Sequence, residues 1–248
     1  MIKFFRTIRK RLLAESKFSK YMMYAMGEII LVVIGILIAI LLNESRIESK
    51  NSNQKQTVLR ALKLEFESNK MQLDTIIYYN EKVTNAYFTA NEMIKNPSKK
   101  FAIKDYEKVI SALGLNYTFN PSNGALRSAI SSSEIHLIEN KQLIKILFSW
   151  EDRVRDSNEE AQRILKYQYE SMPMKLKYIS AVSEWKSFFN EIIPSHRTSN
   201  FKGLTQSVEF ENYSVISYSY AKEYLVEINT IKNQNMKILK LIEEELKK

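Results

Sequence analysis

Residues Tyr21–Leu42 read YMMYAMGEIILVVIGILIAILL and contain one charged side chain, Glu28. As a helix, this segment is about 33 Å long, enough to cross a hydrocarbon core of about 30 Å. The uninterrupted apolar run, Ile29–Leu42, is shorter, and runs of this length also occur in cleaved signal peptides. However, the residues around its end, Leu41–Ser45, do not place small residues at both positions of an A-x-A cleavage site. We therefore predict an uncleaved signal anchor that crosses the membrane once.

Basic residues are densest just before this segment. Residues 1–20 carry a net charge of +6 out of +9 for the whole chain. Positively charged flanks stay in the cytoplasm, so we predict a cytoplasmic N-terminus in the inner membrane of a bacterium, with residues 43–248 in the periplasm. The basic side chains are Lys3, Arg6, Arg9, Lys10, Arg11, Lys17 and Lys20. Three parts follow: a basic segment (1–20), a transmembrane anchor (21–42) and an extracytoplasmic domain (43–248).

The basic segment has a second interpretation. Its apolar residues recur at helical spacing between the Lys and Arg residues, as in Ile2, Phe5, Ile8 and Leu12. Such a helix would lie on anionic membrane lipid. Alternatively, the charges only set the topology. Nucleic-acid binding is disfavoured, because the tail is short and has no partner fold.

The anchor itself carries a candidate interface. At 100° per residue, Tyr24, Glu28, Gly35 and Ala39 fall on one helix face. Small residues four apart allow two helices to approach closely, and a carboxylate inside a bilayer usually has a partner. This pattern predicts self-association or docking to another membrane protein. In the alternative interpretation, Glu28 reaches the headgroup water or Lys20.

The rest of the chain has the composition of long helices. The whole chain has no Cys, four Pro and five Gly, so it offers no thiol chemistry and no glycine-rich phosphate loop. Apolar residues alternate in steps of three and four along three stretches, which predicts long helices before Pro97, over about Asn140–Ser171, and over about Glu209–Leu246. We expect a break at Asn51–Asn53. The first stretch forms a coiled-coil-like seam: Leu59, Leu62, Phe66, Asn69, Leu73, Ile76, Asn80, Val83, Tyr87, Ala90 and Ile94.

These patterns predict an all-α fold: one transmembrane helix followed by an antiparallel bundle of about three long helices with short connecting helices. The short helices are expected at about Lys104–Leu113, Ser122–Ser132 and Ile179–Glu191, with a loop at His196–Gln206. Three seam residues are polar, and they either set the helix register or are local polar gaps: Asn69, Asn80 and Asn235.

Few residues are candidates for catalysis or for binding of a metal or ligand. His136 and His196 are isolated, and Glu134 lies two residues from His136, whereas metal sites in bundles use Glu-x-x-His. We therefore expect no catalytic residue, no cofactor and no metal. The tyrosines Tyr213, Tyr218, Tyr220 and Tyr224 are interpreted as core packing, with an aromatic ligand pocket as the alternative.

Three motifs follow one another at the start of the chain: MIKFFRTIR at Met1–Arg9, KFSKYMMYAMGEII at Lys17–Ile30 and LVVIGILIA at Leu31–Ala39. In these motifs the chain resembles a family of uncharacterised bacterial single-pass membrane proteins. It departs from the family after the anchor, where Leu41–Ser45 replaces an Asn-rich sequence. The resemblance implies one anchor plus an outer helical domain, and it implies no activity.

The sequence thus predicts a membrane-anchored, non-catalytic helical module that acts through protein–protein contacts. The expected partners are membrane lipid and either a second copy or another membrane protein. The alternative function is a periplasmic ligand-binding or sensor module that signals through a separate membrane partner.

Overall fold

The structure is a computed structural model that describes Thr7, residues 18–182 and residues 198–248. The described residues form helices and no strands, which confirms the predicted all-α class for this part of the chain. The chain divides into two compact units, Met1–Gln56 and Thr57–Lys248. Each unit is described separately below.

The first unit consists, where described, mainly of the start of helix α2 (Phe18–Lys95). One described helix is long and apolar enough to span a membrane, and its apolar part lies near the N-terminus. The predicted break at Asn51–Asn53 is wrong, because α2 continues through these residues. Asn and Ser each cost a helix only about 0.5 kcal/mol relative to Ala, and neither Gly nor Pro is present to end it.

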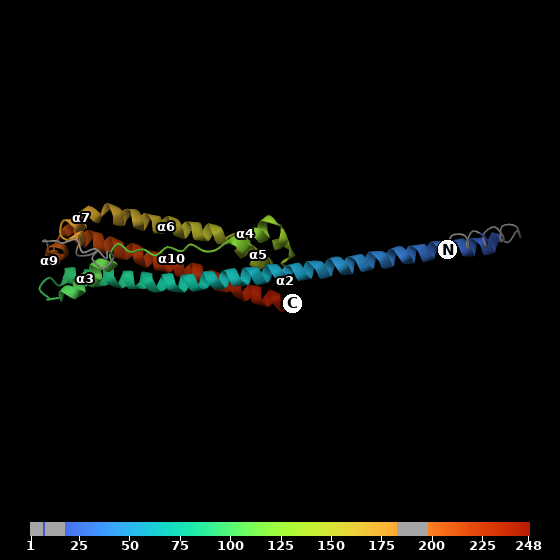
Figure 1. Ribbon diagram of the computed structural model, residues 1–248, viewed down its shortest axis with the longest axis horizontal. Helices are drawn as coiled ribbons and strands as arrows, with labels where there is room; N and C mark the ends of the chain where they lie inside the picture. Colours follow the sequence, from blue (N-terminus) through green and yellow to red (C-terminus); the bar gives the residue numbers. More distant parts are fainter. Residues whose placement is uncertain (1–6, 8–17, 183–197) are drawn as a thin grey trace. The chain divides into compact units, whose positions relative to one another are not determined.

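The second unit contains the end of α2 and all later helices (Figure 1). Two of these are long, α6 (Trp150–Glu170) and α10 (Val208–Leu246). The short ones are α3 (Ile103–Ala112), α4 (Gly124–Ser131), η1 (Glu134–Leu137), α5 (Lys141–Phe148), α7 (Met172–Leu176) and α9 (Phe201–Thr205).

Ion pairs give the direction of the long helices within this unit. Lys63 Nζ lies 2.9 Å from Glu243 Oε1, and Lys232 Nζ lies 2.6 Å from Asp74 Oδ1. Later residues of α2 therefore meet earlier residues of α10, so the two helices run antiparallel. Helices α6 and α10 are also antiparallel, because Arg153 pairs with Glu227 and Arg163 with Glu223. The pairs are at least partly exposed and add little stability, roughly 0–1 kcal/mol each.

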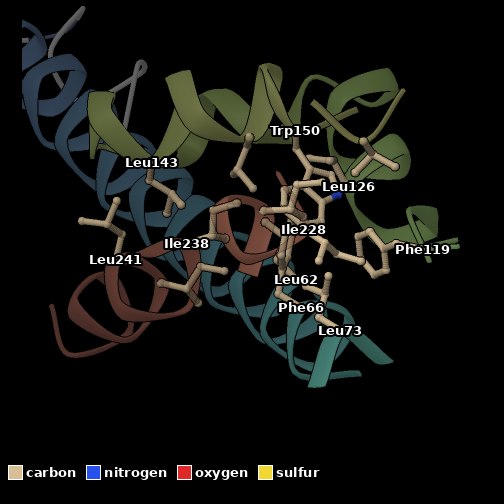
Figure 2. Close-up of a cluster of buried hydrophobic side chains, with 14 of the residues drawn as sticks. Leu62, Phe66, Leu73, Phe119, Leu126, Leu143, Trp150, Ile228, Ile238 and Leu241 are labelled. Atoms are coloured by element: carbon tan, nitrogen blue, oxygen red, sulfur yellow. The ribbon is translucent and has the colours of Figure 1, made fainter. Parts of the chain in front are cut away.

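The main hydrophobic core forms around Trp150, which is fully buried (Figure 2). Its ring meets those of Phe66 at 5.0 Å and Phe119 at 6.1 Å, both edge to face. Leucine and isoleucine side chains from α2, α4, α5 and α10 complete the cluster. A second core cluster, which includes Tyr87 and Tyr213, joins α2, α3, α9 and α10. The seam predicted for α2 is buried in these clusters except at Ile94, which is partly buried.

Several predicted boundaries need correction. The helix expected over Asn140–Ser171 is two helices, α5 and α6, which are separated at Ser149, where ψ is −3° and the hydroxyl donates to Ile146 O. The loop expected at His196–Gln206 contains α9, whose start is capped by Asn200 through Gly203 N at 2.8 Å. The helix expected at Ile179–Glu191 lies mostly outside the described residues.

Candidate functional site

Four residues of the anchor were predicted to share one face of a helix, and all four lie in α2. Their positions span about 60° of the helix circumference at 100° per residue: Tyr24, Glu28, Gly35 and Ala39. A Cβ atom added to Gly35 would have no atom within 4 Å, so the chain itself leaves that position open. Whether another helix packs on this face stays a prediction.

The basic residues predicted to set topology lie almost entirely outside the described residues. Lys20 falls within α2, and the other six do not belong to the described part. Their predicted role is therefore untested by the structure.

The clearest polar arrangement in the second unit surrounds an extended segment, Leu115–Asn123, which we name the strap. The strap connects α3 to α4 and runs alongside the long helices without helical structure of its own (Figure 1). An extended segment cannot satisfy its own backbone groups, so hydrogen-bond partners must come from its neighbours.

Two seam asparagines of α2 supply most of these partners. Asn69 donates to Ser122 O and accepts from Ser122 N, both at 2.9 Å. Asn80 donates to Tyr117 O at 2.8 Å and accepts from Tyr117 N at 3.4 Å. Each amide side chain thus pairs with one strap residue much as a neighbouring β-strand would. Asn69 and Asn80 therefore set the register of the strap on α2, and they do not pair across a helix–helix seam.

The spacing of the two asparagines fits this role. Asn80 is eleven positions after Asn69, about 16.5 Å along the helix axis. Ser122 is five positions after Tyr117, also about 16.5 Å along an extended segment. The two double hydrogen bonds therefore match an extended strap without strain. Asn235, the third polar seam residue, is fully buried on α10, and its amide makes no hydrogen bond among the described residues.

Further contacts hold the ends of the strap. Glu65 of α2 accepts from the backbone N–H groups of Ala125 at 2.7 Å and Leu126 at 3.0 Å. Its carboxylate thus caps the first turn of α4, where a negative charge also favours the helix dipole. Trp150 Nε1 donates to Asn123 Oδ1 at 3.1 Å. The helix that we expected from about Ser122 begins at Gly124, and its first turn is capped by this carboxylate from another helix.

Helices α6 and α10 also contact the strap. Asn116 donates to Ala161 O at 3.2 Å, and Tyr224 OH donates to Tyr117 O at 3.3 Å. Burial raises the pKa of Tyr224 to about 12, so its hydroxyl stays protonated and able to donate. The strap is thus bonded to all three long helices of the unit.

An open hollow of about 600 Å³ lies where the strap meets α2, and we name it the strap hollow. Residues of both elements line it. The polar ones are Ser68, Gln72, Thr75, Asn116 and Thr118.

A second polar cluster lies around Lys175 of α7. Its Nζ donates to Tyr213 OH at 3.4 Å, and Tyr213 OH lies 3.1 Å from Tyr87 OH. Burial lowers the pKa of Lys175 to about 8, and burial raises the pKa of Tyr213 well above its usual value. Among the described residues, Lys175 has no carboxylate within ion-pair distance. The cluster offers an amine that is easily deprotonated beside phenol groups.

The tyrosines predicted from the sequence divide between the two cores. Tyr213 and Tyr224 are buried in different clusters, and Tyr218 and Tyr220 pack against them from the edge. This burial agrees with the packing interpretation. His136 is exposed, and His196 lies outside the described residues. In the described part of the chain, no three Asp, Glu or His side chains gather as a metal site.

Sequence reasoning missed the residues with the most specific contacts. Glu65 and Lys175 had no local signal, because each contacts a residue distant in sequence. The asparagines had a signal, since a polar residue in an apolar seam requires a partner.

We compared the chain with curated proteins, solved structures and protein families. No curated protein and no solved structure matches the chain significantly. A family model matches residues 28–218, which include the apolar run of the anchor, the strap, its asparagines and the Lys175 cluster. The match begins at Glu28, after most of the N-terminal motifs on which the resemblance was based. Because it covers more than half of the chain, this protein belongs to DUF6090, a family of unknown function.

Proposed function

We propose that this protein is a membrane-anchored helical module that acts through protein–protein contacts and not by catalysis. The observation that carries the proposal is the exposure of the apolar residues of the anchor. Between Ile29 and Leu42, the large hydrophobic side chains are 47–68% exposed. Covering one such side chain is worth roughly 1.5–3 kcal/mol. Lipid and a partner helix are the two environments that would cover all of them.

The proposed location is the inner membrane of a bacterium, with the N-terminus in the cytoplasm and residues 43–248 in the periplasm. The net charge of +6 on residues 1–20 supports this orientation. The absence of Cys from the chain allows a direct test with single introduced cysteines. Thr7→Cys and Ser219→Cys both replace exposed residues.

In intact spheroplasts, a membrane-impermeant maleimide should label Ser219→Cys and leave Thr7→Cys unlabelled until the membrane is opened. Labelling of Thr7→Cys alone would invert the orientation. Labelling of both positions while the membrane is closed, together with recovery of the protein in the soluble fraction, would refute the transmembrane anchor.

The proposed interface in the membrane is the helix face of Tyr24, Glu28, Gly35 and Ala39. Its small residues support close packing, and Glu28 supports a specific polar contact. Photoreactive residues at positions 35 and 39 should crosslink in intact cells to a second copy or to one defined membrane protein. Position 37, which is about 200° from position 35, is the control. Equal crosslinking at position 37, or none at 35 and 39, would refute the interface.

Substitution gives an independent test. A Cβ atom at position 35 meets no atom of the chain within 4 Å, so we expect a loss of association in Gly35→Leu to arise between molecules. Gly27→Leu also meets no atom within 4 Å and lies about 80° from Gly35, so it serves as the matched control. We expect co-purification of the partner to fall for Gly35→Leu and for Glu28→Leu, but not for Gly27→Leu. Unchanged association in all three variants would contradict the proposal.

A ligand-binding or sensor module is the second candidate function, and the strap hollow favours it. The hollow joins α2 to the strap, and the strap contacts α6 and α10. A ligand there would therefore touch a segment that is bonded to every long helix of the unit. Ligand-dependent protection of the strap amides from hydrogen exchange would support this function, and unchanged exchange in the presence of a bound ligand would exclude it.

A further inference from the structure

We propose that the strap hollow is a binding site for a neutral saccharide. The proposal concerns residues 68–118 and does not depend on the membrane anchor or on any protein partner. The saccharide site and the protein-contact function can therefore each fail without the other.

The first argument is the absence of charge from the lining. Charged residues make up 26% of the chain, yet none of the residues that line the strap hollow is charged. A second hollow, on α5, α6 and α10, is lined by Asp152, Arg153, Asp156 and Lys237 and provides the contrast. A site without charge does not discriminate in favour of an ionic ligand, and its amide and hydroxyl groups suit a ligand with hydroxyl groups.

The second argument is that several of these polar groups are available. In the described part of the chain, the side chains of Ser68 and Gln72 make no hydrogen bond, and they lie one helical turn apart. Asn116 uses its amide nitrogen to donate to Ala161 O, which leaves its carbonyl oxygen as an acceptor. Together these side chains offer both donors and acceptors, as the hydroxyl groups of a sugar require.

The third argument is the apolar surface beside these groups. Met71 is 66% exposed in the hollow, and Ile76 and Tyr117 also line it. The Tyr117 ring stacks on that of Tyr79, with centroids 4.8 Å apart and planes 20° from parallel. Pyranose rings have apolar C–H faces as well as hydroxyl edges. The Met71 thioether and the Tyr117 ring, next to uncharged polar groups, match both parts.

The fourth argument is that both walls of the hollow are fixed in place. One wall is α2, and the other is the strap, which the double hydrogen bonds of Asn69 and Asn80 hold on α2. A site whose walls are already ordered loses less entropy on binding. An open hollow of this kind fits a short stretch of a sugar chain that continues past the site.

The test uses the full chain in detergent and two sugar probes, triacetylchitotriose and maltotriose. Both are uncharged, and they differ in their acetamido groups. Isothermal titration should give binding of at least one probe. The double variant Ser68→Ala/Gln72→Ala should raise its Kd about tenfold, the effect expected from losing two hydrogen bonds. Neither side chain has a described structural bond, so this variant should keep its fold, which far-ultraviolet circular dichroism checks.

Gln234→Ala is the matched control, because Gln234 is a partly buried glutamine that lines the charged hollow instead. It should leave the Kd unchanged. Binding of triacetylchitotriose alone would assign an acetamido sugar, and binding of maltotriose alone would assign a glucan. No binding of either probe, or an unchanged Kd in the double variant, would overturn the proposal.

Discussion

The double hydrogen bond between Asn69 and Ser122 should contribute measurably to stability. Asn69→Ala removes a donor and an acceptor at once, and it leaves the N–H and C=O of Ser122 without the two 2.9 Å partners that they have now. A hydrogen bond contributes about 1 kcal/mol net, and an unsatisfied group costs about 1–3 kcal/mol when buried. Because these bonds are partly buried, we expect Asn69→Ala to lower the free energy of unfolding by about 2–3 kcal/mol.

Asn85→Ala is the matched control on the same helix. Asn85 is exposed, and its side chain makes no described hydrogen bond. Alanine favours the helix over asparagine by roughly 0.5 kcal/mol, so the control should be neutral or slightly stabilising. Urea unfolding of the full chain in detergent, followed by circular dichroism, compares the two variants.

Hydrogen exchange locates the effect. The Ser122 amide should lose protection in Asn69→Ala, while amides in the middle of α6 should lose protection only to the extent of the global change. If Asn69→Ala and Asn85→Ala unfold at the same urea concentration, or if the Ser122 amide stays protected, then the strap is not held by Asn69 and the reasoning fails.

Three further predictions test the other polar contacts. Glu65→Ala should lower stability by about 1–2 kcal/mol because α4 loses its cap, whereas Glu67→Ala on an exposed position should cost under about 0.5 kcal/mol; urea unfolding measures both. The pKa of Lys175 is about 8 in the folded protein and 10.5 in the unfolded chain, so the free energy of unfolding should rise with pH between these two values. Lys175→Met should abolish that rise in thermal melts recorded at the same pH values. A double-mutant cycle on Asp74 and Lys232 should give a coupling of about 0.2–1 kcal/mol that decreases in 1 M salt.

The long helices could be predicted because their residues repeat with the period of a helix. Residues at helical spacing along α10, such as Tyr224, Ile228 and Asn235, are buried. A helix that buries one face needs an apolar residue every three to four positions, whichever element packs on that face. The helix can therefore be predicted without knowledge of its partner. The same local information placed the start of a helix at about Asn140, which caps α5 by accepting from Gln142 N and Leu143 N.

The misses arise where a distant residue or a tertiary contact decides the local structure. Helix α9 is short and polar around its ends, but Leu204 is fully buried and Phe201 stacks on Tyr106 at 5.7 Å. Those contacts, not helix propensity, stabilise it. The start of α4 is capped by Glu65, which lies about 60 residues earlier in the chain. A reading of neighbouring residues cannot detect such a cap.

The polar seam residues of α2 nevertheless contain a usable signal. A helix packed against that seam would satisfy its own backbone and would need only apolar partners, so Asn69 and Asn80 would be costly there. An extended segment has the opposite requirement, because its backbone groups need donors and acceptors at intervals set by its rise per residue. Asn69 and Asn80, eleven positions apart on a helix, meet that requirement for Tyr117 and Ser122, which are five positions apart on the strap. Polar seam residues at this spacing therefore indicate an extended segment beside the helix, and the segment that they order forms one wall of the strap hollow.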